Sequence, residues 1–356
     1  MTRKLAAWAL PAALVLSAHG GAFATVSAEK VERTGPNRIV VTWTDKDPVD
    51  VYVAERPDAA LADAKLLSTA DRDGRYESAA GSARPFFLLK DRGDGSVVRT
   101  AERLIPLEQG SNFRDLGGYP AAGGKRVRWG RIFRSGGTPM LTDADLKEIQ
   151  SLGLADMVDL RSSEERVLAP SRIYGVSYHA VGYSMMTIMG DVKDPASSRN
   201  DLGKVYERLP TVLQPELREL FEALLQGDGP LAYNCSAGQD RTGFASALVL
   251  TALGTPRDVI YADYLLSTAY RRPEWEMPKI SPAVAQENPT AAFFARYQDN
   301  PGARKPTPLV DSEGRPLVQR AMEAIEQKYG SVEAYLDKEI GVDAADIAKL
   351  RALYLE

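Results

Sequence analysis

Residues 234–243, Asn-Cys-Ser-Ala-Gly-Gln-Asp-Arg-Thr-Gly, constrain this chain more than any other stretch of its sequence. They follow a short apolar run at residues 230–233 and precede a helical pattern at residues 244–253. A strand, a tight turn with glycine and a helix N-terminus form an anion site, because backbone N–H groups and the helix dipole converge there. The sequence therefore predicts an anion-binding loop, in which the bound group is lined by Ser236, Ala237, Gly238 and Gln239.

Two side chains of this loop add chemistry to the anion site. Cys235 is the only cysteine of the chain, and Arg241 follows it in a Cys-x5-Arg-Thr pattern. An anion site stabilises a thiolate, the nucleophilic form of cysteine, and the planar guanidinium of arginine matches two phosphate oxygens. The pattern therefore predicts a site for a phosphate monoester with a built-in nucleophile. We expect the hydroxyl of Thr242 to stabilise the thiolate.

The composition argues against several other classes of protein. The net charge of −4 gives no general attraction to nucleic acid, so no nucleic-acid partner is expected. A single cysteine cannot form an internal disulfide. His19 lies in the N-terminal segment, which leaves His179 as the one other histidine, and we expect it to be structural. Multi-histidine metal sites and a Ser-His-Asp triad are therefore not expected, and the chemistry needs no metal or other cofactor.

The N-terminal segment has the pattern of a secretory signal peptide. Arg3 and Lys4 precede an apolar run at residues 5–18, and residues 22–24, Ala-Phe-Ala, fit a cleavage site. The alternative is an uncleaved anchor, but the run is shorter than the ~20 residues that span a bilayer. We therefore expect residues 1–24 to be removed, the protein to be exported to the periplasm or secreted, and no stable membrane insertion.

Two folding units are expected after the signal. Residues 28–105 hold short strand patterns separated by turns and predict a small antiparallel sandwich, of fibronectin type III or immunoglobulin kind, that acts as a docking or packing module. The expected strands are residues 38–44, 49–54, 75–79, 84–90 and 96–105.

Residues 108–356 alternate strand and helix patterns and predict an α/β domain with a largely parallel sheet flanked by helices. Ligands of such sheets lie at the carboxyl ends of the strands, where Cys235 falls. Thr142 is the expected N-cap of a helix at residues 142–152, and residues 181–205 are expected to form a mobile lid. Further strands are expected at residues 127–133 and 155–160, and further helices at residues 215–225, 258–270, 317–329 and, divided at Gly341, 331–355.

The loop resembles the active loop of protein tyrosine phosphatases, and more narrowly that of an atypical bacterial branch with exported tyrosine and phosphoinositide phosphatases. Residues 112–119, Asn-Phe-Arg-Asp-Leu-Gly-Gly-Tyr, and 159–162, Asp-Leu-Arg-Ser, also match that branch. The resemblance covers roughly residues 108–355 and implies a tyrosine-phosphatase-like fold and a phosphocysteine intermediate. Further matching stretches are residues 130–136, residues 263–267, Glu164 and Glu165.

The leaving group needs a proton, and the resemblance implicates two aspartates as its donor. These are Asp240, which lies within the loop and is the preferred candidate, and Asp159, for which capping of a strand-to-helix turn is the structural alternative. Weaker candidates are Asp191, Asp194 and Asp201 of the expected lid. Arg114, together with Asp115, Arg134 and Arg161, is expected either to contact substrate or to hold residues 112–119 against the loop through buried ion pairs.

Two positions depart from the resembled branch: Asn234 replaces its histidine, and Gln239 replaces its lysine. We hypothesise that Asn234 weakens stabilisation of the thiolate and that Gln239 disfavours multiply charged substrates. The sequence thus predicts a cysteine-dependent phosphomonoester hydrolase acting on phosphotyrosine proteins or small phosphate esters. The alternatives are a phosphoinositide or inositol-phosphate phosphatase with the same mechanism and a phosphate-binding pseudophosphatase; an arsenate reductase would need more cysteines.

Overall fold

The computed structural model describes residues 26–35, 37–79, 84–189, 199–300, 302, 305 and 307–356. The expected signal peptide lies outside these residues, as do Asp191 and Asp194 of the expected lid. The side chain of Asp201, the third acidic residue of that segment, is not described either.

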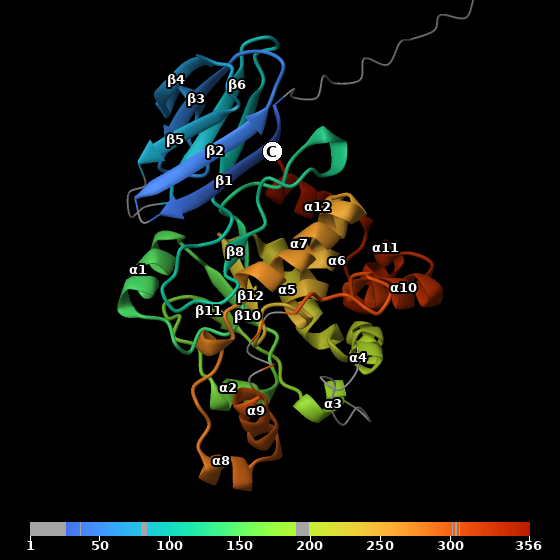
Figure 1. Ribbon diagram of the computed structural model, residues 1–356. Helices are drawn as coiled ribbons and strands as arrows, with labels where there is room; N and C mark the ends of the chain where they lie inside the picture. The colour runs from blue at the N-terminus through green and yellow to red at the C-terminus, as the bar shows by residue number, and fades with distance from the viewer. Residues whose placement is uncertain are drawn as a thin grey trace, which may run out of the picture.

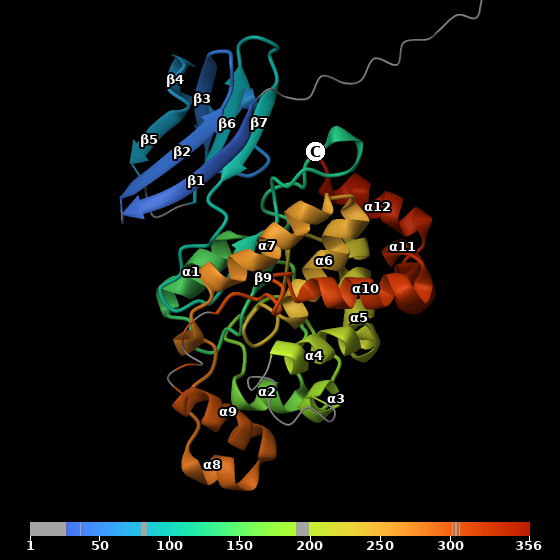
Figure 2. The ribbon, with the colours of Figure 1, turned by 45° about the vertical axis from the view of Figure 1, so that its right-hand side comes forward.

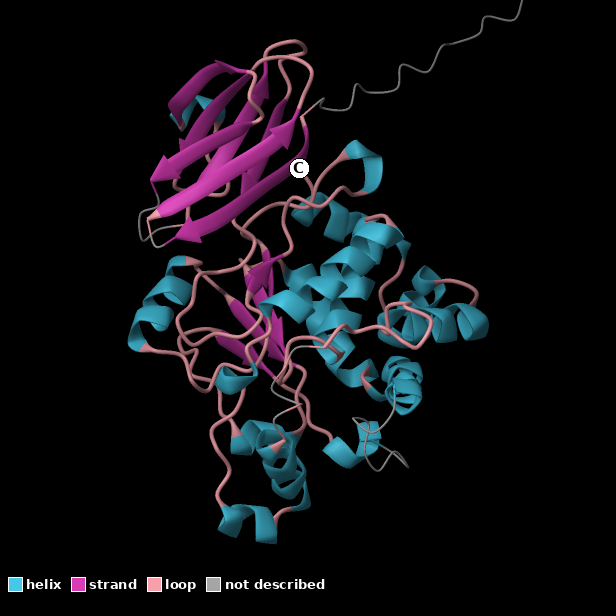
Figure 3. Ribbon diagram, viewed as in Figure 1, coloured by secondary structure: helices cyan, strands magenta, loops and turns pink. Residues whose placement is uncertain are grey.

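An antiparallel β region forms the N-terminal part of the chain (Figures 1 and 3). A three-stranded sheet of order β1-β2-β5 packs on a four-stranded sheet of order β4-β3-β6-β7. Alternating side chains such as Ile39, Val41 and Phe87 fill the space between the sheets. The expected sandwich is therefore confirmed. Its strands are β1 Ser27–Gly35, β2 Arg38–Thr44, β3 Val49–Ala54, β4 Lys65–Asp71, β5 Arg75–Ala79, β6 Phe86–Asp91 and β7 Val97–Ala101.

A second, five-stranded sheet has the order β11-β10-β12-β9-β8. Its strand pairs are parallel except for β8 with β9, which confirms the largely parallel sheet. The central strand β12 is buried along its whole length and ends at Asn234, so that Cys235 emerges at its carboxyl end. The strands are β8 Arg114–Asp115, β9 Ile132–Ser135, β10 Asp156–Asp159, β11 Ser177–His179 and β12 Leu231–Asn234.

Helices cover both faces of this sheet. Phe133, Met157 and Ala232 point to the face that α1 covers, whereas Ile132, Val158 and Leu231 join the larger core with α5 and α6. The helices are α1 Asp143–Ser151, α2 Ser163–Leu168, α3 Met185–Met189, α4 Arg199–Val212, α5 Gln214–Gln226, α6 Arg241–Leu253, α7 Arg257–Tyr270, α8 Pro282–Glu287, α9 Pro289–Asp299, α10 Val318–Tyr329, α11 Val332–Tyr335, the π-helical turn η4 Leu336–Ile340 and α12 Ala344–Tyr354.

Local signals fix several helix ends as expected. Thr142 caps α1, since its hydroxyl accepts a hydrogen bond from Asp145 N while the Asp145 side chain accepts one from Thr142 N. Gly341 ends the turn at residues 336–340 in the left-handed conformation. The segment expected to be a lid contains α3 and the start of α4 on either side of residues that the structure does not describe, and its mobility stays a prediction. None of the helices described is long and apolar enough to cross a bilayer.

A buried ion pair joins the sandwich to the second sheet. Arg84 Nη1 donates to Asp115 Oδ2 at 2.9 Å, and its Nε donates to the carbonyl of Glu102 at 2.7 Å. The Arg84 guanidinium also lies over the ring of Trp129, 5.4 Å from its centroid. Asp115 is fully buried and accepts two more hydrogen bonds, from Gly117 N and Gly130 N. The two parts of the chain therefore share a charged, fully desolvated contact.

Candidate active site

The predicted anion loop occupies residues 235–240, between β12 and α6. Cys235 is only 1 % exposed and lies at the base of the loop. Gly238 adopts a φ of +65°, and a Cβ there would lie 2.5 Å from backbone atoms of Ser135 and Gly136. A side chain is therefore excluded at this position both by backbone conformation and by space. The tight turn that the glycine predicted is present.

The carbonyl groups of the loop are held from outside. Asn112 Nδ2 donates to the carbonyl of Gly238 at 2.8 Å and to that of Ala237 at 3.3 Å. Arg134 Nη2 also donates to Gly238 O, and Gly137 N donates to Ser236 O, each at 2.8 Å. Because C=O and N–H point in opposite directions across a peptide unit, the N–H groups of these units point away from the anchoring side chains, as an anion-binding loop requires.

Behind the loop, Asp263 of α7 binds two arginines. Arg114 Nε donates to its Oδ1 at 3.1 Å and Arg134 Nη1 to its Oδ2 at 2.7 Å. Burial would raise the pKa of Asp263, but the two guanidinium groups lower it well below its usual range. The Arg114 guanidinium is fully buried behind the loop, where it also binds Ser267 and Asn112, and it does not line the cavity. The alternative role, a buried ion pair supporting residues 112–119, matches this position.

Arg241 points into the site and is fixed by Glu165, the third residue of α2. Arg241 Nη1 and Nη2 donate to the two Glu165 oxygens at 2.6 and 2.7 Å, and Ser236 Oγ donates to Oε1 at 2.6 Å. Tyr183 OH accepts a further bond from Arg241 Nη1 at 2.7 Å. Burial would raise the pKa of Glu165, but Arg241 outweighs it and lowers the pKa to about 2. A fixed, charged guanidinium therefore lines the cavity above the loop.

The two candidate proton donors have different environments. Asp240 lines the cavity, and its Oδ1 accepts a hydrogen bond from Tyr206 OH at 2.5 Å. Asp159 is 1 % exposed and does not line the cavity; its carboxylate binds Arg161 at 2.6–3.1 Å and also accepts from Tyr178 OH. The geometry of Asp159 thus matches the structural alternative, support of the turn from β10 into α2.

The cavity above the loop has a volume of about 180 Å³. Its far wall comes from α9 and from the segment after α7, where Arg271 is bound by Glu276 and Tyr297 at 2.8–2.9 Å. Arg271 Nη1 also lies 3.4 Å from Gln239 Oε1. The lining residues are Glu165, Met185, Ser236, Ala237, Gln239, Asp240, Arg241, Arg271, Pro273, Glu276, Met277, Phe293, Phe294, Tyr297 and Gln298.

Two predicted features of the loop differ in detail. Thr242 Oγ1 is buried without a hydrogen-bond partner among the described residues, so the bond expected from it to the sulfur of Cys235 is not formed. Asn234 Nδ2 donates to the carbonyl of Cys235 at 3.2 Å, while its Oδ1 is buried and accepts no bond from the described part of the chain. His179 binds Asp156 at 2.9 Å, as expected of a structural histidine.

Sequence analysis missed the side chains that fix the loop from a distance. Glu165 was noted within a motif but given no role, although Ser162-x-x-Glu165 is a capping-box pattern that fixes its place in the first turn of α2. Tyr183 and Tyr206 lie in or beside the segment expected to be a lid, and nothing in their neighbourhood marked them. The aromatic residues of α9 gave no signal of a cavity wall.

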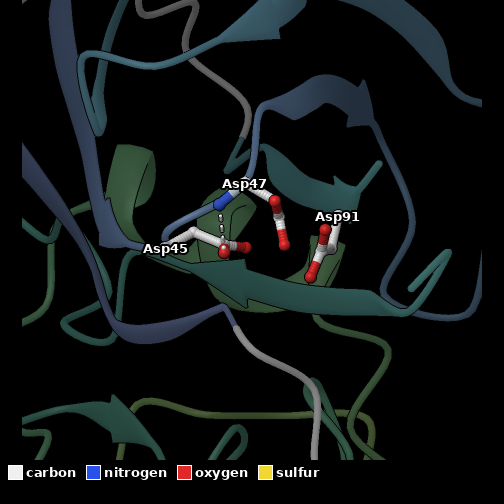
Figure 4. A group of neighbouring side chains, drawn as sticks. All are labelled: Asp45, Asp47 and Asp91. Atoms are coloured by element: carbon white, nitrogen blue, oxygen red, sulfur yellow. Dashed lines mark hydrogen bonds between the residues drawn. The ribbon is translucent and has the colours of Figure 1, made fainter. Parts of the chain in front are cut away.

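Far from this cavity, Asp45, Asp47 and Asp91 group their carboxylates within 4.8 Å of one another in the turns of the sandwich (Figure 4). Asp45 Oδ1 accepts from Asp47 N at 3.0 Å, and Asp91 Oδ1 accepts from Gly93 N at 2.6 Å. These bonds are those of aspartates that stabilise turns. The group could hold a cation, but its position separates it from the chemistry of the loop.

Comparison with known proteins agrees with the geometry of the loop. Residues 105–356 match the tyrosine phosphatase family, and the chain belongs to that family of hydrolases. A Cupriavidus necator protein, provisionally named a tyrosine-protein phosphatase, is 36% identical over 259 residues, covering 69% of this chain and 86% of the relative. The triple specificity protein phosphatase PtpB of Mycobacterium tuberculosis is 29% identical over 280 residues, covering 68% of this chain and 96% of PtpB. The solved structure of P. aeruginosa TpbA covers 51% of this chain and 88% of its own, at 13% identity and a TM-score of 0.26.

Proposed function

We propose that this protein hydrolyses phosphate monoesters through a phosphocysteine formed on Cys235, and that phosphotyrosine in proteins is its substrate. One observation carries the proposal: Cys235 and Asp240 belong to one loop, Arg241 follows that loop and is held by Glu165 of α2, and Asp240, Arg241 and Glu165 line one cavity. The three groups supply a nucleophile, a positive clamp and a proton donor, which are the parts that this hydrolysis needs.

The first step transfers the phosphoryl group to sulfur. Cys235 Sγ attacks phosphorus, the S–P bond forms and the bond to the leaving oxygen breaks. Arg241 and the loop N–H groups bind the phosphoryl oxygens, whose charge is largest in the transition state. Asp240 gives a proton to the leaving oxygen, because its carboxyl lines the cavity whereas that of Asp159 is held by Arg161. In the second step Asp240 takes a proton from water, which attacks phosphorus and releases phosphate and the thiolate.

The shape and charge of the cavity favour an aryl phosphate with one phosphate group. Met277, Phe293 and Phe294 offer apolar contact to an aromatic leaving group. Both arginines of the lining are paired with glutamates, Arg241 with Glu165 and Arg271 with Glu276. Since Gln239 adds no charge, the lining has no surplus positive charge for additional phosphates. The preference for phosphotyrosine over phosphoinositides rests on this balance.

The test is turnover of p-nitrophenyl phosphate in the presence of a metal chelator, with Cys235→Ser as the matched variant and vanadate as inhibitor. We expect vanadate-sensitive turnover by the unaltered protein and none by the variant. Absence of turnover from pH 5 to 8 would favour a phosphate-binding protein without catalysis. Equal turnover by Cys235→Ser would exclude the cysteine as nucleophile.

Substrate preference needs a second comparison, of a phosphotyrosine peptide, a phosphoserine peptide and a phosphoinositide at equal concentration. We expect the highest kcat/KM for the phosphotyrosine peptide. A Gln239→Lys variant should shift the ratio toward the phosphoinositide, because it adds a positive charge to the lining. A higher kcat/KM of the unaltered protein for the phosphoinositide would favour the alternative substrate class.

We also propose that the protein works outside the cytoplasm, on the strength of the charged and apolar pattern at residues 3–18 and the Ala-Phe-Ala site. The test is the N-terminal sequence of the protein recovered from the periplasmic and extracellular fractions. A protein that begins near residue 25 in either fraction supports export. Retention of residues 1–24 in the cytoplasmic fraction would contradict it.

A further inference from the structure

The Asp240 side chain is held by a hydrogen bond to one of its two carboxylate oxygens. Tyr206 OH donates to Oδ1 at 2.5 Å, and Oδ2 accepts no hydrogen bond from the residues that the structure describes. Tyr206 is completely buried, whereas the Asp240 carboxyl borders the cavity. The loop therefore presents a carboxyl group with one oxygen fixed from the protein interior and the other available to a ligand.

A second buried tyrosine lies beside this hydrogen bond. Tyr206 OH and Tyr264 OH lie 2.6 Å apart, and their rings meet edge to face with centroids 6.2 Å apart. Each phenol has one proton, and that of Tyr206 is given to Asp240. Tyr264 therefore donates to Tyr206, and the chain of donors runs from Tyr264 through Tyr206 to Asp240.

The neighbours of Tyr264 hold its ring in place. Gly243 faces the Tyr264 ring, and a Cβ there would lie 2.7 Å from ring atom Cδ2. Tyr264 is 1 % exposed and follows Asp263, which holds Arg114 and Arg134. The phenol pair is thus fixed to the same helix, α7, that supports the catalytic loop from behind.

We propose that Tyr206, oriented by Tyr264, is a positioning residue that decides which oxygen of Asp240 carries the proton. This proposal rests on the role of Asp240 as proton donor given above. In the protonated carboxyl one oxygen is a carbonyl acceptor and the other is a hydroxyl. Because Tyr206 donates to Oδ1, that oxygen is the acceptor and the proton lies on Oδ2, where it faces the leaving group.

The same bond assists the transfer in both directions. When the Oδ2 proton moves to the leaving oxygen, the negative charge that remains on Asp240 is stabilised by the donor Tyr206. Oδ2, without a partner of its own, can then accept the proton of the water that attacks the phosphocysteine. A single fixed orientation therefore serves the acid of the first step and the base of the second.

The experiment compares Tyr206→Phe with the unaltered protein on aryl phosphates whose leaving phenols range from p-nitrophenol to phenol. Values of kcat/KM report the step that breaks the bond to the leaving group, whatever limits kcat. We expect Tyr206→Phe to lower kcat/KM about 10- to 100-fold for phenyl phosphate, the size of one hydrogen bond to a charged group, and much less for p-nitrophenyl phosphate. Tyr264→Phe should act in the same direction but less.

Tyr354→Phe is the matched control, since it removes the hydroxyl of another buried tyrosine. Tyr354 OH donates to Leu224 O over a distance of 2.8 Å, and this hydrogen bond is not part of the loop. We expect it to leave the dependence on the leaving group unchanged. A loss equal for all leaving groups in Tyr206→Phe, or no loss, would overturn the proposal; Tyr264→Phe decides the question if Tyr206→Phe does not fold. Asp240→Asn separates the two proposals. If this variant does not make kcat/KM depend more steeply on the leaving phenol, Asp240 is not the acid, whatever the result for Tyr206→Phe.

Discussion

Glu165→Gln tests how much the buried ion pair between Glu165 and Arg241 contributes to stability and to catalysis. The carboxylate is fully buried and accepts four hydrogen bonds: two from Arg241, one from Ser236 Oγ and one from Ser162 N. Glutamine keeps the shape and one acceptor oxygen. Its NH₂ group, however, must face a donor of Arg241, and the buried guanidinium loses its counter-charge.

Two independent routes give the size of the effect on stability. Breaking a buried ion pair by changing one partner costs about 3–5 kcal/mol, and the retained acceptor of glutamine places this case at the lower end. The pKa of Glu165, lowered from 4.5 to about 2, means that the ionised form is favoured in the folded protein by about 3 kcal/mol. We therefore expect the free energy of unfolding to fall by about 3 kcal/mol.

Catalysis should suffer as well, because Arg241 is then no longer held in the orientation that binds the phosphoryl oxygens. Loss of one fixed donor of this kind costs about 10²- to 10³-fold in kcat. The assays are urea unfolding and turnover of p-nitrophenyl phosphate. The matched control is Glu164→Gln, one residue earlier in α2, whose half-buried carboxylate binds Ser184 and Met185 N instead. If Glu165→Gln alters stability and kcat no more than Glu164→Gln, the argument from the buried pair is refuted.

Other predictions follow from the same contacts. Arg84→Met should lower the free energy of unfolding by about 3–5 kcal/mol, seen in urea unfolding, because it leaves the Asp115 carboxylate buried without a counter-charge; a change below 1 kcal/mol would contradict this. Since the pKa of Glu165 is lowered on folding to about 2, its contribution is complete above pH 4.5 and is lost as pH falls toward 2. The urea midpoint should therefore drop over that range, and less so in Glu165→Gln. Asn234→His should raise turnover at pH 5 relative to pH 7, because an imidazolium adds positive charge beside Cys235; superimposable pH–rate profiles would dismiss this effect.

The parts of the site that sequence could predict are those set by local rules. The strand, the glycine turn at Gly238 and the helix from Arg241 follow one another directly, and each has its own signal in the sequence. The same holds for Thr142, whose capping box fixes the start of α1. In these cases the interacting groups lie within a few residues, so composition and spacing contain the information.

Partners distant in sequence gave no such signal. Glu165 and Arg241 are 76 residues apart, and Tyr206 and Asp240 are 34 apart, so that only the folded sheet brings them together. Asp159 illustrates the reverse case: it precedes Arg161 by two residues, and this short spacing supplies the ion pair that occupies its carboxylate. A motif shared with a family indicates that a residue matters, but not whether it faces the substrate or the interior.

Residues 112–115 show how one motif can serve both sides of the molecule. Side chains of adjacent strand residues point to opposite faces, so Arg114 reaches Asp263 behind the catalytic loop while Asp115 reaches Arg84 of the sandwich. Asn112 binds the loop carbonyls directly. The family match begins at residue 105, so Arg84 lies outside it, yet Arg84 neutralises a carboxylate that the match contains. Since a buried carboxylate without its cation is costly, the Arg84–Asp115 pair ties the sandwich energetically to the strand that supports the catalytic loop.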